Sequence, residues 1–186
     1  MLIIQFTGLS GAGKTTLACQ AKKDLEYDNI SLEIIDGDFY RQTKNEDLGF
    51  SKEDRKENVR RLALAATSFE GRRSAVIIAA INPYEEVRRE LKKKYAAKTI
   101  WINCRLGDLL VRDTKGLYRR AYLPEGHPEK IYNLTGVNDP YEVPETPDLI
   151  LNTHQETVAE SLKKLCDFIK MHCSDSFASF PAPGIS

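Results

Sequence analysis

Eight residues near the start of the chain have the composition and spacing of a phosphate-binding loop. They read Gly8-Leu9-Ser10-Gly11-Ala12-Gly13-Lys14-Thr15 and match the pattern G-x-x-x-x-G-K-[ST] in full. The glycines allow successive backbone N–H groups to turn toward one point, and a helix beginning near Lys14 adds the positive end of its dipole. Lys14 would then neutralise the β- and γ-phosphates, while the Thr15 hydroxyl would bind Mg²⁺. The segment therefore predicts a site for a nucleoside triphosphate.

This loop is shared by kinases, GTPases and motor ATPases, so further residues must separate these classes. A GTPase would be expected to contain the guanine-reading sequence N-K-x-D, which the chain lacks. Its D-x-x-G string, Asp113-Thr114-Lys115-Gly116, follows an expected helix and not a strand. These observations favour a small phosphotransferase.

A pair of acidic residues, Asp36 and Asp38, follows the second expected strand, and Arg41 comes three residues later. The carboxyl ends of parallel strands form the edge at which ligands bind, so this pair should face the same crevice as the phosphate-binding loop. Asp38 could orient or deprotonate an acceptor hydroxyl, or hold Mg²⁺ through water, and Arg41 could bind an anionic group. The alternative is an Asp-Gly turn that simply ends a strand.

An expected helix at residues 52–69, capped by Ser51 and Asp54, carries polar residues on its apolar face. At about 100° per residue, Arg55 and Asn58 lie on the same side as its apolar residues and therefore point inward. An anionic nucleotide would supply the partners that these buried groups need, although an internal salt bridge is the alternative for Arg55. Arg60 points away and is expected to be solvated.

A stretch rich in proline, tyrosine and basic residues, 113–147, has no clear helical or strand period. It is too long for a simple connection, so we expect a lid, roughly residues 113–137, that shields the reacting phosphoryl group from water. Basic residues at its start could reach bound phosphates on closure. The runs Arg88-Arg89 and Lys92-Lys93-Lys94 are instead expected to be solvated surface charges.

Apolar runs alternate with helical periods along the rest of the chain. We expect strands at 2–7, 31–36, 75–81, 99–104 and 148–152, and helices at 14–27, 52–69, 84–94, 106–112 and 154–172. The last helix would begin with a capping box formed by Thr153 and Glu156. This order predicts an α/β protein with the three-layer P-loop NTPase fold: a doubly wound, five-stranded parallel sheet with helices on both faces. Residues 1–173 would form one kinase domain, and residues 174–186 a flexible tail.

Composition excludes several other classes. The chain has 27 basic and 27 acidic residues, so it has no global positive field to bind nucleic acid or an anionic membrane. Its longest apolar run, 75–81, is far too short to span a bilayer, and its start lacks the basic segment of a signal peptide. The four cysteines form no C-x-x-C pair, which argues against a metal cage. Cys19 and Cys104 are expected to be small buried residues in a reducing cytoplasm.

With these residues assembled, the chain resembles the adenylyl-sulfate kinase family from its first expected strand to Thr153. The segment DLGFS-x-x-DR-x-EN-x-RR at 47–61 is highly specific. The shared segments occur in family order: GLSGAGKTT at 8–16, DGD with Arg41, the 47–61 segment, Asn82-Pro83-Tyr84, RDTKGLY at 112–118, LTG at 134–136 and PYE at 140–142.

The resemblance implies transfer of the γ-phosphoryl group of ATP to the 3′-hydroxyl of adenosine 5′-phosphosulfate, with Mg²⁺ as cofactor. It implies catalytic roles for Lys14 and Asp38, and Mg²⁺ binding by Thr15 and by Asp38, the latter directly or through water. ATP would contact Gly8, Leu9, Ser10, Gly11, Ala12, Gly13, Lys14, Thr15, Thr16 and Arg112. The acceptor would contact Asp38, Arg41, Phe50, Arg55, Asn58, Ile81, Asn82, Lys115 and Leu134, with Phe50 stacked on its adenine. A homodimer is compatible with the resemblance.

Three positions depart from the family pattern. Asn82 replaces the usual serine before Pro-Tyr, which excludes phosphoserine chemistry there, and Phe39 replaces the asparagine that usually follows DGD. Leu134 replaces a phenylalanine before Thr-Gly, so an aromatic clamp on the acceptor base would become one-sided. The lid is also longer than usual between Tyr118 and Thr135.

Because these changes cluster on the acceptor side, another small nucleotide-like anion remains an alternative acceptor. A polynucleotide 5′-kinase shares the Asp-x-x-Arg spacing at 38–41, but the zero net charge disfavours it. An ATP-binding regulatory protein without turnover is disfavoured by Lys14, Thr15 and Asp38.

Overall fold

The sheet of the protein is parallel and five-stranded, as the sequence predicts. The computed structural model describes residues 1–69 and 74–174. The strand order is β2-β3-β1-β4-β5, so the first strand of the chain lies in the middle. The strands are β1 (Leu2–Thr7), β2 (Ser31–Asp36), β3 (Ser74–Ala79), β4 (Lys98–Asn103) and β5 (Leu149–Asn152). β1 pairs with β3 on one side and β4 on the other, both in parallel.

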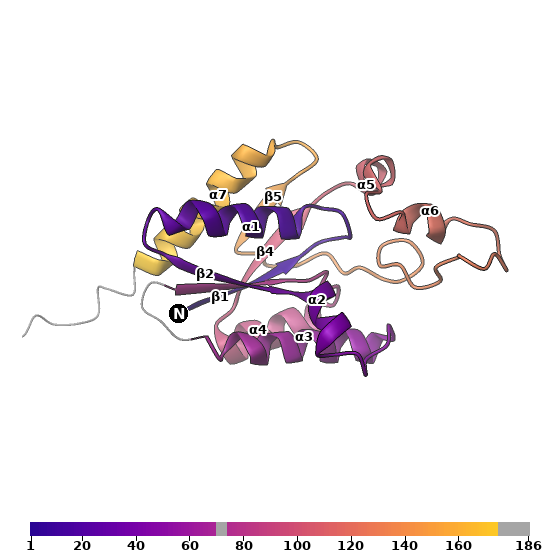
Figure 1. Cartoon of the computed structure of the whole chain (residues 1–186), viewed down its shortest axis with the longest axis horizontal. Helices are drawn as coiled ribbons and strands as arrows, with labels where there is room; N and C mark the ends of the chain where they lie inside the picture. The colour runs from indigo at the N-terminus through magenta and orange to yellow at the C-terminus, as the bar shows by residue number, and fades with distance from the viewer. Residues whose placement is uncertain (70–73, 175–186) are drawn as a thin grey trace, which may run out of the picture.

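Helices cover both faces of the sheet, which confirms the predicted three-layer fold (Figure 1). α1 (Lys14–Glu26) and α7 (Val158–Ser174) pack on one face, and α3 (Lys52–Ala66) and α4 (Glu85–Tyr95) on the other. The short α2 (Gly37–Thr43) follows β2 directly. α5 (Leu106–Arg112), which was expected as a helix, and α6 (Leu117–Ala121), which falls in the segment expected to form a lid, project beyond the carboxyl end of the sheet.

The side chains of β1 alternate between the two layers, because successive residues of a strand point to opposite faces. Ile4 and Phe6 are fully buried in the core formed with α1 and α7. Ile3 packs in the second core, against α3 and α4. On this second face β1 also carries Gln5 and Thr7, two polar side chains that are fully buried and must be satisfied by hydrogen bonds.

Several boundaries differ from the sequence expectation. The third strand ends at Ala79, not at residue 81, because the chain leaves the ladder and turns at Asn82, which has a φ of 44°. The last helix begins at Val158, and its capping box is formed by Thr157 and Glu160. The box predicted at residues 153 and 156 is therefore wrong.

Two helices and one cysteine were also misjudged. α2 and α6 were not expected from the sequence, since each is too short to show a helical period. Cys104 is buried as predicted, but Cys19 is exposed on α1. Among residues 1–69 and 74–174, the structure has no helix that could cross a membrane. The tail assigned to residues 174–186 lies outside the described residues beyond Ser174.

Candidate active site

The phosphate-binding loop connects β1 to α1, as its motif requires. Gly8 packs so tightly that a Cβ there would lie 2.4 Å from the carbonyl oxygen of Ile102. Gly13 has a φ of 102°, in the left-handed region that favours glycine. Lys14 Nζ donates hydrogen bonds to the carbonyl oxygens of Gly8 (2.9 Å) and Leu9 (2.7 Å), so it lies folded back across the loop. The backbone is thus shaped to bind an anion.

Burial makes Lys14 unusually easy to deprotonate. Desolvation lowers the pKa of Lys14 to about 8, which the negative charges of Asp38 and Asp36 oppose and the positive charge of Lys115 reinforces. A phosphate group bound in the loop would favour the charged form and raise this pKa again. Lys14 is therefore a cationic group whose charge a bound anion would stabilise.

Asp36 organises the segment after β2. Its Oδ1 accepts hydrogen bonds from the backbone N–H groups of Asp38 (2.9 Å) and Phe39 (3.1 Å) and so caps α2. Its Oδ2 accepts a hydrogen bond from the Thr15 hydroxyl at 2.9 Å. The segment is therefore the start of a helix and more than a turn. Thr15 and Asp38 were predicted from the sequence to bind the metal but Asp36 was not, although Asp36 belongs to the same acidic pair.

Asp38 contacts Lys115, in the segment that was expected to form a lid. Lys115 Nζ lies 2.6 Å from Asp38 Oδ2, and both side chains are more than half exposed to solvent. The same segment also contacts the phosphate-binding loop, because the buried Tyr118 hydroxyl donates to the Ser10 carbonyl oxygen at 2.8 Å. Lys115 was expected to contact nucleotides, and in this structure it contacts the proposed catalytic carboxylate.

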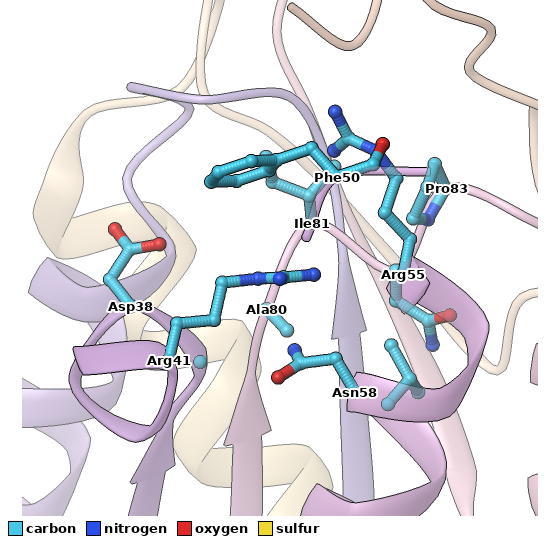
Figure 2. Close-up of a pocket in the computed structure, with 11 residues that line it drawn as sticks. Asp38, Arg41, Phe50, Arg55, Asn58, Ala80, Ile81 and Pro83 are labelled. Carbon is cyan, nitrogen blue, oxygen red and sulfur yellow. The ribbon is translucent and has the colours of Figure 1, made fainter. Parts of the chain in front are cut away.

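A small, partly open pocket lies beside Asp38 and is lined by most of the acceptor residues named from the sequence. In Figure 2, α2 contributes Asp38 and Arg41, α3 contributes Arg55 and Asn58, and the ring of Phe50 lies across the opening. The pocket is lined by Gly37, Asp38, Arg41, Phe50, Arg55, Asn58, Val59, Ala80, Ile81, Asn82 and Pro83. The predicted inward direction of Arg55 and Asn58 is confirmed, since their exposed fractions are 7% and 4%.

The pocket combines two cations with an aromatic ring. The guanidinium carbons of Arg41 and Arg55 lie 4.9 Å and 5.4 Å from the centroid of Phe50. Burial lowers the pKa of Arg41, and the neighbouring charge of Arg55 lowers it further. The positive charges of Arg41 and Arg55 repel each other, so binding an anion between them is favourable. The pocket therefore suits a ligand with an anionic group and a planar ring.

Arg55 also makes internal contacts, including the internal salt bridge that was the alternative to ligand binding. Its guanidinium donates to the carbonyl oxygens of Phe50 (2.9 Å) and Asn133 (2.5 Å) and to the Thr135 hydroxyl (3.0 Å). Its Nε lies 3.4 Å from Asp139 Oδ2. Arg55 thus lines the pocket and at the same time attaches α3 to the segment 133–139. Arg60, expected to be solvated, is instead partly exposed and pairs with Glu90 at 2.9 Å.

Two of the predicted acceptor residues, Lys115 and Leu134, do not line this pocket. Leu134 is 6% exposed and packs in the larger hydrophobic core, not among the residues that line the pocket. Arg112 donates to the Thr153 carbonyl oxygen at 2.9 Å, and the Thr153 hydroxyl donates to the Ala12 carbonyl oxygen at 2.9 Å. Arg112 therefore lies near the phosphate-binding loop. Thr16 is exposed at the start of α1.

Comparison with known proteins points to one family. The family model for adenylylsulphate kinase matches residues 1–152. The adenylyl-sulfate kinase of Deinococcus deserti is 41% identical over 168 residues, which are 90% of each chain, and that of Bacillus licheniformis is 40% identical over 90% of this chain and 84% of its own. A probable bifunctional SAT/APS kinase of Sorangium cellulosum is 40% identical over 88% of this chain, which spans 27% of that protein.

Solved structures give a similar result. The APS kinase CysC of Mycobacterium tuberculosis, in complex with AMPPNP and APS, has a TM-score of 0.81 and 34% identity, and the match covers 91% of this chain and 97% of that one. A gluconokinase from Sinorhizobium meliloti has a TM-score of 0.60 at 14% identity, which shows a common fold and nothing finer.

Proposed function

The chain belongs to the adenylyl-sulfate kinase family, and on that premise we propose that it phosphorylates the 3′-hydroxyl of adenosine 5′-phosphosulfate with ATP. The observation that carries the proposal is the position of Asp38. It lines the pocket proposed for the acceptor, and its backbone N–H is bonded to Asp36, which also accepts a hydrogen bond from Thr15 of the phosphate-binding loop. This supports a carboxylate that acts between the two substrates. The products would be ADP and 3′-phosphoadenosine 5′-phosphosulfate.

Catalysis would rest on positioning and charge, as phosphoryl transfer generally requires. The loop from Gly8 to Thr16 would hold the phosphates of ATP, with Arg112 near its base. Lys14 would leave the carbonyl oxygens of Gly8 and Leu9 and neutralise the phosphoryl group in transfer. Asp38 would accept a hydrogen bond from the 3′-hydroxyl and take its proton, once Lys115 has released the carboxylate.

The acidic edge of the sheet fits Mg²⁺. Thr15 offers a hydroxyl oxygen bonded to the Asp36 carboxylate, and Asp38, whose backbone N–H is bonded to the same carboxylate, would offer a second one. These are the hard oxygen donors that Mg²⁺ prefers, and Mg²⁺ usually takes one or two protein carboxylates together with phosphates and water. Within the described residues there is no cluster of three or more His, Cys, Asp and Glu side chains. When bound, it would offset the negative charge of the phosphates.

The acceptor pocket accounts for the other substrate. Arg41 and Arg55 would bind the phosphosulfate, and Phe50 would stack on the adenine. Asn58, Ile81, Asn82 and Lys115 would complete the contacts. Leu134 would act only indirectly, because it is buried in the core. Phe50 would therefore hold the base from one side.

We also propose that the enzyme acts in the cytoplasm, where ATP is available. We propose in addition that it forms a homodimer, which light scattering would test.

The proposed function is tested by measuring ADP release with and without each of several acceptors. We expect adenosine 5′-phosphosulfate to stimulate release strongly and to give the highest kcat/KM of the panel. Adenosine 5′-phosphate and a DNA 5′-end serve as competitors, and activity on the mononucleotide should be insensitive to salt. Equal rates with and without the sulfated acceptor would rule the proposal out. A higher kcat/KM for a different anion would select the alternative acceptor that the changes at Asn82 and Leu134 left open.

The low pKa of Lys14 predicts a pH-dependent proton uptake on ATP binding. Near pH 8.5 a large share of ATP-free protein carries neutral Lys14, because its pKa is about 8. Bound phosphates raise this pKa, so binding at pH 8.5 should take up protons, and ATP affinity should fall as the pH rises above 8. Calorimetry in buffers with different ionisation enthalpies measures the uptake. Binding at pH 8.5 without net proton uptake would show that Lys14 is already charged.

A further inference from the structure

A cluster of buried polar residues lies between the sheet and α4, behind residues 81–83, which form one wall of the acceptor pocket. Gln5 and Thr7 of β1 have no exposed surface, and Asn82, Arg88 and Thr99 are 2%, 2% and 4% exposed. The side chains of Arg88 and Arg89 were both expected to be solvated surface charges. The structure contradicts this for Arg88, while the side chain of Arg89 is 62% exposed. A buried guanidinium is costly unless its charge and donors are matched.

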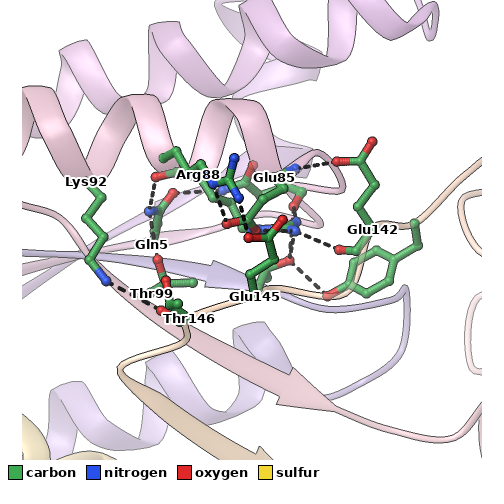
Figure 3. Close-up of polar contacts among 12 residues, drawn as sticks. Gln5, Glu85, Arg88, Lys92, Thr99, Glu142, Glu145 and Thr146 are labelled. Carbon is green, nitrogen blue, oxygen red and sulfur yellow. Dashed lines mark hydrogen bonds and ion pairs between the residues drawn. The ribbon is translucent and has the colours of Figure 1, made fainter.

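Arg88 satisfies these requirements by joining three separate segments (Figure 3). Its Nε and Nη2 both lie 2.8 Å from Glu85 Oε2, which balances its charge. Its Nη1 donates to the carbonyl oxygen of Asn82 at 2.8 Å and approaches the Thr7 hydroxyl at 3.4 Å. Its Nη2 also donates to the carbonyl oxygen of Glu142 at 2.7 Å. One side chain thus connects the pocket wall, the end of β1 and the segment that returns from the lid.

Gln5 holds the side chain of Asn82 from the other direction. Gln5 Nε2 donates to the Arg88 carbonyl oxygen at 2.9 Å and to the Thr99 hydroxyl at 3.0 Å. A backbone carbonyl can only accept, so this contact fixes which end of the Gln5 amide is the donor. Gln5 Oε1 must then accept from Asn82 Nδ2, at 2.9 Å. Asn82 is therefore held at its backbone by Arg88 and at its side chain by Gln5, in a left-handed conformation with φ 44°.

The wall that this network holds contacts both the acceptor pocket and the phosphate-binding loop. Ile81 and Asn82 line the acceptor pocket, and the Ile81 carbonyl oxygen accepts from the backbone N–H of Gly8 at 3.2 Å. On the far side, the backbone N–H of Glu142 donates to the Pro83 carbonyl oxygen at 2.9 Å. A shift of Arg88 would therefore move the pocket wall relative to Arg41 and Phe50, which stand on other elements.

We propose that Arg88 is a positioning residue for the acceptor: it holds the wall at 81–83 in register with the rest of the pocket without touching the substrate. The inference rests on the proposed function for its kinetic readout. A guanidinium reaches acceptors in several directions within one plane, whereas the ammonium of lysine acts as a single point. Lysine at this position would keep the charge but could not hold Asn82, Glu142 and Glu85 together.

The test compares Arg88→Lys with Arg89→Lys, its exposed neighbour on α4. For Arg88→Lys we expect kcat/KM for the acceptor to fall by about 10-fold to 10²-fold, mostly through KM, with the KM for ATP within about twofold. Arg89→Lys should leave both values unchanged. If Arg88→Lys does not fold, Gln5→Leu loosens the same wall, since a leucine side chain cannot accept the hydrogen bond that Asn82 Nδ2 donates to Gln5 Oε1. Equal rises in both KM values, or a lower melting temperature with an unchanged acceptor KM, would overturn the proposal.

Hydrogen exchange supplies a readout that does not depend on the acceptor. The backbone N–H groups of Gly8 and Glu142 are bonded to the wall, so both should exchange faster in Arg88→Lys and at the wild-type rate in Arg89→Lys. If wild-type protein shows no acceptor-dependent ADP release, the proposed function fails, and this exchange pattern alone decides on Arg88. Unchanged exchange at both positions would contradict the positioning role.

Discussion

Replacing Asp38 with asparagine is expected to lower kcat by roughly 10²–10⁴, with little change in ATP binding. Asparagine keeps the size of the side chain and one carbonyl oxygen, but it cannot take a proton from the 3′-hydroxyl. The backbone of α2 should be preserved, because its cap is formed by Asp36 and not by Asp38. The measurement is acceptor-dependent ADP release at saturating substrates, with ATP binding measured separately by calorimetry.

A matched control for this variant is Asp167→Asn on α7, which removes an exposed carboxylate paired with Lys163. Its kcat should stay within about twofold of wild type, as is usual for surface positions. Should Asp38→Asn retain more than about a tenth of wild-type kcat, the carboxylate would not be the proton acceptor. A large loss of ATP affinity would instead assign Asp38 mainly to the metal.

Replacing Lys14 with alanine is expected to lower kcat/KM for ATP by roughly 10²–10³, the cost of losing one well-placed electrostatic contact to the reacting group. Lys14 is the partly buried cation of the phosphate-binding loop, and its contacts to Gly8 and Leu9 hold it at the place where phosphates would bind. The loss should appear in both kcat and the KM for ATP, since the same charge acts on bound ATP and on the transition state. Initial rates over a range of ATP concentrations separate the two.

Lys22→Ala, on the same helix, is the corresponding control. Lys22 forms an exposed ion pair with Glu33 at 2.9 Å, away from the loop, and exposed pairs of this kind contribute little. Its kinetic constants should match those of wild type. A Lys14→Ala enzyme within about tenfold of wild type would show that the loop amides and the metal alone support transfer.

The parts of the site that could be predicted from sequence are those that depend on local pattern. The loop at 8–15 is contiguous, so its glycines and Lys14 specify their own geometry. The inward direction of Arg55 and Asn58 follows from helical periodicity in α3. The same rule could have found Arg88, which lies three residues before the buried Leu91 on α4. It was missed because a charged residue next to another was assumed to be solvated.

Other features depend on contacts between distant segments, which a sequence pattern does not contain. The structural role of Gln5 depends on its hydrogen bonds to Thr99, Arg88 and Asn82, which lie far from it along the chain. Leu134 was expected to contact the acceptor, and the structure buries its side chain in the larger hydrophobic core. The misplaced capping box has a similar cause. Two Thr-x-x-Glu sequences that match the capping-box pattern begin at Thr153 and Thr157. The first does not cap the helix, because the Thr153 hydroxyl donates to the phosphate-binding loop.

The central claim, that phosphoryl transfer from ATP ends on the 3′-oxygen of a sulfated adenine nucleotide, is tested most directly by identifying the product. Purified protein would be incubated with ATP, Mg²⁺ and adenosine 5′-phosphosulfate, and the phosphorylated nucleotide located by ³¹P NMR and mass spectrometry. We expect one new phosphate monoester, coupled to the proton at C3′, formed in equal amount to ADP. ADP without a new ester, or an ester at another position, would contradict the account.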